Sequence, residues 1–165
     1  MSLRRDSGRL IAGFALLAVL HFYARPRIWG GDSRAAPDFL LLGLMLFAIR
    51  ARPGMAALGG FLTGLLTDVL TPAHFGVGAL AYTLVGYLAA WGRAVFFPHN
   101  LMVNVGFFAG AVVVRDLIML IASGSGRALG SAGFLIGSPL QALTTAIAGT
   151  VVLLFFRKWF AVRMA

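Results

Sequence analysis

The sequence contains no cysteine and no glutamate. Without cysteine, disulfide bonds, thiolate nucleophiles and cysteine-ligated metals are excluded. The few carboxylates are dispersed along the chain and form no cluster that would hold magnesium and a pyrophosphate. An enzyme is therefore the class of protein with the least support, and we predict no catalytic residue, no cofactor and no metal site. The five acidic residues are Asp6, Asp32, Asp38, Asp68 and Asp116.

Sequence motifs of soluble enzymes are also missing. There is no Walker A loop, no Gly-x-Ser-x-Gly elbow and no His-Glu-x-x-His helix. The three histidines, His21, His74 and His99, fall in different segments, and none sits beside an acid at helical offset. Metal binding by histidine is therefore not expected.

Charge is scarce and apolar residues dominate, since 12% of the residues are charged and 60% are hydrophobic. This composition is typical of a protein that lies in lipid. At about 20 apolar residues per spanning helix, 165 residues leave room for about six spans and no soluble domain. We predict an all-α integral membrane protein whose residues 1–165 form a single transmembrane helical domain.

Six apolar runs are separated by proline, glycine and charge. The first two are short for a hydrocarbon core of about 30 Å, so five or four full crossings remain an alternative to six. The first run follows several arginines but ends without a small-residue cleavage site, which indicates a retained helix and not a signal peptide. The runs are Leu10–Tyr23, Pro37–Ile49, Gly54–Leu70, Phe75–Trp91, Leu101–Ala122 and Ala132–Phe156.

The net charge of +9 comes from arginines at the ends of the apolar runs, which indicates orientation in a membrane and not nucleic-acid binding. With six crossings, nine Lys and Arg residues fall on the side of the two termini and four on the other. Cytoplasmic loops carry the excess of positive charge, so both termini are expected to be cytoplasmic. The minority side holds Arg25, Arg27, Arg34 and Arg127, and Arg115 lies inside a run.

Glycines recur four residues apart within the runs. Small residues let helix backbones approach closely in lipid. The main interpretation is packing within one bundle, and the alternative is a docking face for another membrane protein. The pairs are Gly60/Gly64, Gly106/Gly110 and Gly133/Gly137. The glycines to which we assign a helix-packing role are Gly60, Gly64, Gly76, Gly86, Gly106 and Gly110.

Three aspartates and one arginine could carry a polar site. Pro37-Asp38 opens the second run, where aspartate can cap a helix, although pairing with an arginine or a partner at the outer face is an alternative. Asp68 lies near the outer end of the third run, and both hydrogen bonding within the bundle and contact with a partner or ligand stay open.

Arg115-Asp116 interrupts the fifth run. Consecutive helix residues point about 100° apart, so we expect each of the two to reach another helix and not to neutralise its neighbour fully. Cross-linking of helices and a functional polar site are both compatible with this pair.

The block from Pro37-Asp38 through Gly60-Phe-Leu-Thr-Gly64-Leu-Leu-Thr-Asp68 to Gly76-Val-Gly78-Ala-Leu-Ala-Tyr82-Thr-Leu-Val-Gly86-Tyr87 resembles the MreD family of rod shape-determining membrane proteins. The resemblance covers residues 37 to 93, and the rest of the chain agrees in length, span count and basic termini. The matching positions are Pro37, Asp38, Gly64, Asp68, Gly76, Ala79, Tyr82, Gly86 and Tyr87.

This resemblance implies a non-enzymatic subunit of the cell-elongation machinery in the bacterial cytoplasmic membrane. Its partners would be an MreC-like single-span protein, RodA and a class B penicillin-binding transpeptidase, with MreB contacted indirectly and membrane lipids around it. The family also looks like the S components of energy-coupling-factor vitamin transporters. A solute-binding transport subunit is therefore the alternative, with polar groups converging near the outer face from Asp38, Asp68, Thr71, His74 and Tyr82.

Overall fold

In a computed structural model of the chain, residues 13–24, 27, 36–70, 75–92, 101–124 and 132–155 can be described. Within these ranges the chain is helical and contains no strand. The N-terminal helix (Gly13–Tyr23) ends in a π-helical turn, η1 (Leu20–Ala24). It is followed by α3 (Phe39–Ala48), α4 (Pro53–Leu70), α5 (Val77–Gly92), α6 (Leu101–Ala122) and α7 (Ala132–Phe155).

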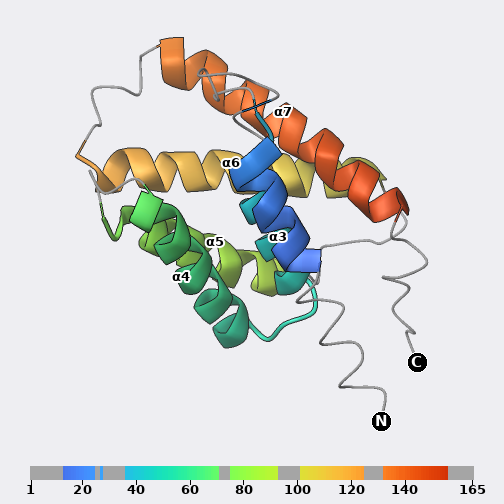
Figure 1. The fold of residues 1–165 in the computed structure, drawn as a ribbon, viewed down its shortest axis with the longest axis horizontal. Helices are drawn as coiled ribbons and strands as arrows, with labels where there is room; N and C mark the ends of the chain where they lie inside the picture. Colours follow the sequence, from blue (N-terminus) through green and yellow to red (C-terminus); the bar gives the residue numbers. More distant parts are fainter. Residues whose placement is uncertain are drawn as a thin grey trace.

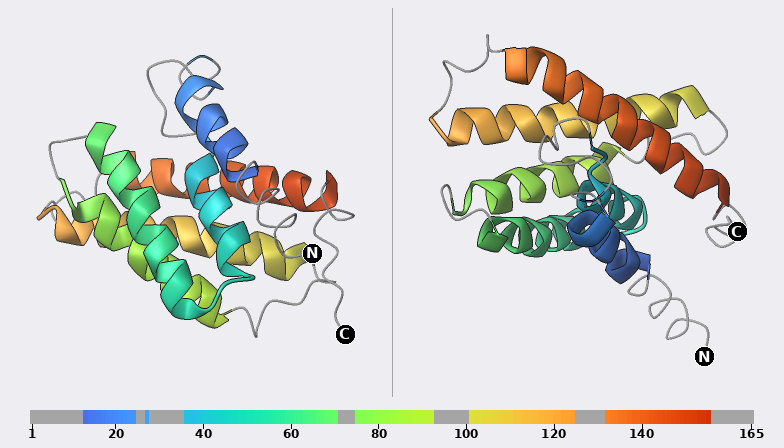
Figure 2. Two further views of the ribbon diagram at one scale, coloured as in Figure 1. Left: turned by 60° about the horizontal axis from the view of Figure 1, so that its bottom comes forward. Right: turned by 45° about the horizontal axis from the view of Figure 1, so that its top comes forward.

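Two pairs of neighbouring helices enclose α3. Helices α4 and α5 lie side by side, α6 and α7 form the second pair, and α3 contacts all four (Figures 1 and 2). The N-terminal helix packs on the side of α3 away from the second pair (Figure 2). The helices match the six apolar runs closely, because proline, glycine and charge mark the ends of these runs.

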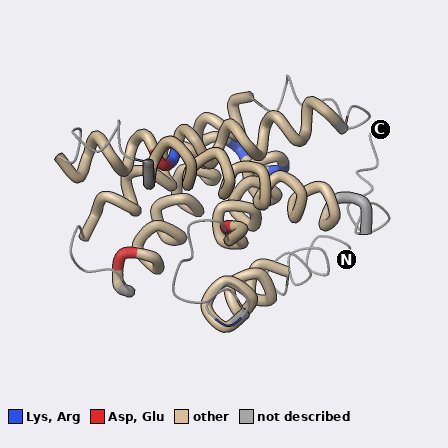
Figure 3. The backbone as a smooth tube through the Cα atoms, turned by 90° about the horizontal axis from the view of Figure 1, so that it is seen from above, with Lys and Arg blue, Asp and Glu red and all other residues tan. Residues whose placement is uncertain are grey.

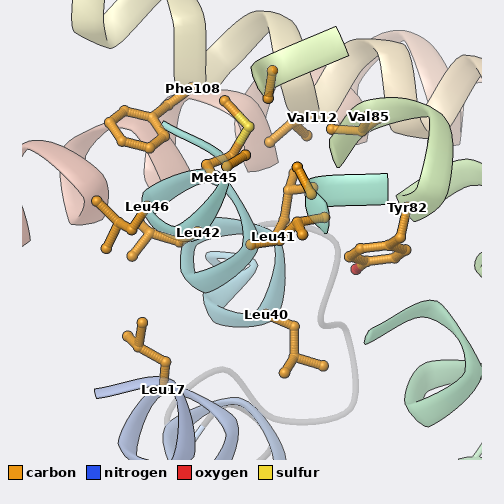
Figure 4. Close-up of a cluster of buried hydrophobic side chains, with 14 of the residues drawn as sticks. Leu17, Leu40, Leu41, Leu42, Met45, Leu46, Tyr82, Val85, Phe108 and Val112 are labelled. Carbon is orange, nitrogen blue, oxygen red and sulfur yellow. The ribbon is translucent and has the colours of Figure 1, made fainter. Parts of the chain in front are cut away.

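Helix α3 is the centre of the core. Eight of its ten residues are buried, and its sequence, Phe39-Leu-Leu-Leu-Gly-Leu-Met-Leu-Phe-Ala48, offers no polar face. A helix that is apolar all round is stable only when it is surrounded. Figure 4 shows leucines of α3 pointing in several directions, toward Leu17 of the N-terminal helix, Tyr82 of α5 and Phe108 of α6.

The lengths of the helices differ. Ten residues at about 1.5 Å per residue make α3 roughly 15 Å long, about half of a hydrocarbon core, so α3 by itself is too short to cross a bilayer. Met102–Ala122 and Phe134–Val152 are long and apolar enough to do so. Leucine, valine, isoleucine and aromatic side chains are exposed over the outer faces, and charged residues are sparse along the described backbone (Figure 3). The described chain has the surface of an all-α membrane protein.

Glycines set the close contact between α4 and α5. A Cβ added to Gly60 would lie 2.1 Å from the carbonyl oxygen of Tyr82, and one added to Gly64 would lie 2.4 Å from the Cα of Ala79. From the α5 side, a Cβ on Gly86 would lie 2.5 Å from the carbonyl oxygen of Ala56. The backbones touch here because no side chain separates them.

Three other glycines do not have the packing role expected for them. Nothing lies within 4 Å of a Cβ built on Gly106 or Gly110, so these residues do not mediate a close helix contact within the described chain. Gly76 has a φ of +96° and forms the turn before α5, so it serves the backbone conformation and not helix packing. Four-residue spacing alone did not show which glycines face a neighbouring helix. Gly133 of the third pair has no described surroundings.

A buried charge network as the candidate functional site

Asp38 is the residue from which the network is built. It follows the buried Pro37, has extended backbone angles, and caps α3 through Oδ1, which accepts hydrogen bonds from the N–H groups of Leu40 at 3.1 Å and Leu41 at 3.0 Å. A capping carboxylate also interacts favourably with the positive end of the helix dipole. Only 1% of the residue is exposed, so its second oxygen also needs donors from the protein.

Those donors come from α5 and α6. The hydroxyl of Tyr82 donates to Oδ2 of Asp38 at 2.7 Å, and Nη1 of Arg115 donates to the same oxygen. Tyr82 is 2% exposed and Arg115 is 6% exposed. One carboxylate thereby joins the start of α3 to the middle of two other helices.

The guanidinium of Arg115 uses each of its three nitrogens. Nη1 reaches Asp38 and lies 3.4 Å from the Tyr82 hydroxyl, while Nε donates to Oδ1 of Asp116 at 2.9 Å. Nη2 donates to the same oxygen of Asp116 and, at 2.9 Å, to Oε1 of Gln141 on α7. An arginine inside a membrane costs about 2.5–3.5 kcal/mol unless it is buried and paired, and this one is both.

The expectation for Arg115 and Asp116 is half right. Arg115 reaches Asp38 at the start of α3 and Gln141 on α7, as predicted, but the partner of Asp116 within the described part of the chain is Arg115 itself. The long arginine side chain can fold back along its own helix, which the angle between consecutive Cβ directions does not take into account. Asp116 therefore supplies local charge balance.

Helix α7 contributes uncharged partners that the sequence interpretation did not include. Thr145 accepts the backbone N–H of Asp38 at 3.0 Å, and Gln141 donates to the carbonyl oxygen of Ala36 at 3.2 Å. Their spacing of four residues places them on one face of α7. Two polar residues at this spacing within an apolar helix are the signal that could have identified them.

His21 was also missed. Its Nδ1 lies 3.4 Å from Oδ1 of Asp38, and 8% of the residue is exposed. No acid lies at helical offset from His21 on its own helix, and Asp38, the acid it meets, stands after a separate segment of chain. Only tertiary contact brings the two together.

Asp68 forms a second, separate polar contact. It sits near the end of α4, is 2% exposed, and accepts three backbone N–H groups at the start of α5. Gly76 and Ala79 donate to Oδ2, both at 2.9 Å, and Gly78 donates to Oδ1 at 3.0 Å. The first N–H groups of a helix have no partner within it, so Asp68 supplies that partner from the neighbouring helix. A Cβ on Gly78 would lie 2.2 Å from Oδ1, so a larger residue there would displace the carboxylate from these hydrogen bonds.

Tyr87 and the two open glycines face outward. Tyr87 is 47% exposed on α5. Gly106 and Gly110 border an apolar hollow of about 250 Å³ between α5 and α6. We call this hollow the α5–α6 groove; the other residues that line it are Met45, Val85, Leu88, Ala89, Phe107, Ala111 and Val114.

The network is suited to holding helices together. Its carboxylate, guanidinium, amide and hydroxyl groups bond to one another, and no group of three or more His, Cys, Asp or Glu residues in the described ranges could hold a metal ion. Of the groups expected to converge on a solute, Asp38 and Tyr82 do meet, but Asp68 bonds to the start of α5. Thr71 and His74 lie outside the described residues.

Comparison with known proteins gives one match. A family model described as rod shape-determining protein MreD matches residues 8–162. No curated protein and no solved structure matches the chain. The family match extends well beyond the block of residues 37 to 93 that carries the resemblance in the sequence.

Proposed function

Because the chain belongs to the MreD family of rod shape-determining proteins, we propose that it is a non-enzymatic, multi-pass subunit of the bacterial cell-elongation complex in the cytoplasmic membrane. In this role it holds or regulates the peptidoglycan-synthesising proteins. Its direct partner is an MreC-like single-span protein, with RodA and a class B penicillin-binding transpeptidase in the same complex and MreB reached indirectly. The observation that carries the proposal is the family match over nearly the whole chain.

The buried network supports a structural role for the charged residues. Asp38, Tyr82 and Arg115 are each at most 6% exposed and bonded to one another, so they cannot touch a partner directly while the bundle is intact. Their contribution to the complex is to fix the relative positions of α3, α5 and α6. Among the described residues, much of the exposed surface that remains for a partner is apolar.

The α5–α6 groove is the surface we assign to that partner. Its wall is apolar, and Gly106 and Gly110 leave open space where side chains would otherwise stand. In lipid, helices associate through close van der Waals contact at small residues, so a single apolar helix gains most where the surface is hollow. Tyr87, exposed on α5, is the second candidate contact.

Affinity purification tests the complex. The tagged chain, isolated from its host's membranes in mild detergent, should bring down an MreC-like protein identified by mass spectrometry. A photo-crosslinking residue at Gly110 should trap it, whereas one at Leu62, which is 58% exposed on α4, should not. Trapping at Leu62 alone would move the interface away from the groove.

The same purification distinguishes the elongation-complex role from the alternative function, a vitamin-transporter subunit. Recovery of a transmembrane T component with paired ATPases, and of no MreC-like chain, would identify a vitamin-transporter subunit and reject the elongation-complex proposal. The mutual pairing of the buried polar side chains supports the elongation role, because it leaves fewer groups to hold a solute.

The proposed topology has six crossings, in which flanking residues or local thinning of the bilayer complete the short α3 span. It places both termini in the cytoplasm, as supported by the excess of Lys and Arg on their side. Reporter enzymes active on only one side of the membrane, fused after the last residue, test this directly. Activity of a reporter that works only outside the cytoplasm would contradict it.

A further inference from the structure

The α5–α6 groove is too small for a helix. It encloses about 250 Å³ and reaches between α5 and α6 to Met45 of the central helix α3, which is 1% exposed. A helix with its side chains is about 10–12 Å across and rises about 5.4 Å per turn, so one turn fills roughly 400 Å³. A partner helix can therefore pack over the groove, but its backbone does not enter it. The occupant of the groove itself is a thinner chain.

The lining of the groove favours an apolar occupant. The residues that line it are glycines or have apolar side chains, so a polar group buried there would lose its hydrogen bonds to water without gaining others. Nothing lies within 4 Å of a Cβ built on Gly106 or Gly110. Atoms beside an empty space lose dispersion contacts, and in a membrane the apolar material nearest to the groove is the acyl chain of a lipid.

One end of the groove lies at the level of the lipid headgroups. The segment Met102–Ala122 of α6 has 21 residues, and at about 1.5 Å per residue it spans roughly 30 Å, the thickness of the hydrocarbon core. The end of α5 lies beside the start of α6, since a Cβ built on Gly92 would lie 3.5 Å from the ring of Phe107. The neighbouring Trp91 is 73% exposed, and tryptophan is enriched at the boundary between membrane and water. The start of α6 and the end of α5 therefore mark this boundary.

Asn104 provides an unpaired polar group at the same end. The residue is 6% exposed, and its buried Oδ1 has no hydrogen-bond partner within the described chain. Asn104 precedes Phe107 by three residues and Ala111 by seven, so it lies on the same face of α6 as these two lining residues. Helix side chains lean toward the N-terminus of their helix, which brings the amide toward the headgroup level. A buried acceptor without a donor is unfavourable, and a donor from a bound molecule would satisfy it.

We propose that a phospholipid binds at the α5–α6 groove, with one acyl chain in the groove and a hydrogen-bond donor of its headgroup on Oδ1 of Asn104. The ammonium of phosphatidylethanolamine and the hydroxyls of phosphatidylglycerol are such donors, whereas the headgroup of phosphatidylcholine has no N–H or O–H group. The site therefore distinguishes headgroups. Where it concerns the partner, the inference rests on the proposed function: the helix assigned to this groove packs over a lipid that is already bound.

Native mass spectrometry of the full chain measures lipid binding. The protein is released from detergent micelles after addition of phosphatidylethanolamine, phosphatidylglycerol or phosphatidylcholine with identical acyl chains. It should retain one molecule of either of the first two lipids. Phosphatidylcholine should bind about two- to tenfold more weakly, which is the effect of one lost hydrogen bond. Equal retention of the three lipids would overturn the proposal.

Three variants test the two parts of the site. Gly110→Leu fills the groove and should abolish retention, whereas Gly54→Leu, at another glycine with open space around it, should retain the lipid as the parent does. Asn104→Leu should lower the binding of phosphatidylethanolamine to that of phosphatidylcholine. Because it removes an unpaired polar group, this variant should keep at least the unfolding temperature of the parent.

Retention by Gly110→Leu equal to that by Gly54→Leu would also overturn the proposal, as would an undiminished headgroup preference in Asn104→Leu. The measurement uses the chain alone. Its failure would therefore leave the elongation-complex proposal standing, because that proposal is tested by co-purification of a partner.

Discussion

Arg115 on α6 donates to the carboxylate of Asp38, a residue 77 positions earlier that caps the central helix α3. The two side chains are 8% and 1% exposed, so each needs a partner of opposite charge within the protein to compensate for leaving water. A capping residue usually stabilises its own helix only. Here the same carboxylate also fixes α5 through Tyr82, so capping and tertiary packing depend on each other.

Replacement of Arg115 by leucine should strongly destabilise the bundle. The change leaves Asp38 buried without its cation, and breaking a buried ion pair costs about 3–5 kcal/mol. We expect a clear fall in the unfolding temperature in detergent. Arg52→Leu is the matched control, because Arg52 is exposed at the start of α4. A variant at Arg115 as heat-resistant as the parent would contradict the role assigned to the pair.

The two tyrosines of α5 give a comparison within one helix. Tyr82→Phe removes a hydrogen bond to a buried carboxylate and should cost about 1.5–3 kcal/mol, the usual contribution of a bond to a charged group. Tyr87→Phe changes the same atoms on an exposed face and should have little effect on the free energy of unfolding. Steric trapping or denaturant titration in micelles measures both, and equal losses would show that burial of Tyr82 is not what matters.

Alanine at the glycines of α4 and α6 should have opposite effects. Gly60→Ala and Gly64→Ala place a Cβ against the α5 backbone, which cannot yield as a side chain can, so we expect a loss of about 1–3 kcal/mol or more. Gly106→Ala meets open space and should gain up to about 1 kcal/mol from helix propensity. Thermal unfolding of the three variants checks the signs, and destabilisation by Gly106→Ala would place a neighbour where the structure has none.

Asp68→Asn should loosen the start of α5. The amide has only one oxygen with which to accept the three N–H groups that the carboxylate now holds. Hydrogen exchange should accelerate at Gly76, Gly78 and Ala79 and stay unchanged at Ala146 in the middle of α7. Faster exchange throughout the molecule would indicate global destabilisation in place of a lost cap.

Much of the helix pattern follows from the sequence. The six apolar runs correspond to the helices because proline, glycine and charged residues separate one run from the next. In lipid, an uninterrupted apolar segment is stable as a helix because its backbone groups then bond to one another. The sequence also indicated which polar residues need partners, because Arg115 is a charged residue within an apolar run. Asp38 likewise stands out as a capping residue after proline.

The partners of those residues could not be inferred from the sequence. His21, Gln141 and Thr145 join Asp38 and Arg115 only because separate helices place them around one point, and no local period encodes that meeting. The surroundings of the glycines also could not be inferred from the sequence. Gly60 and Gly106 both belong to pairs spaced four residues apart, but Gly60 faces the backbone of α5 and Gly106 faces open space. By itself the sequence determined that the chain forms apolar helices, where they end, and which polar residues need partners. The tertiary structure alone decided which partners they have, because side-chain contacts across helices depend on rotation and crossing, and these are set by packing of the whole bundle.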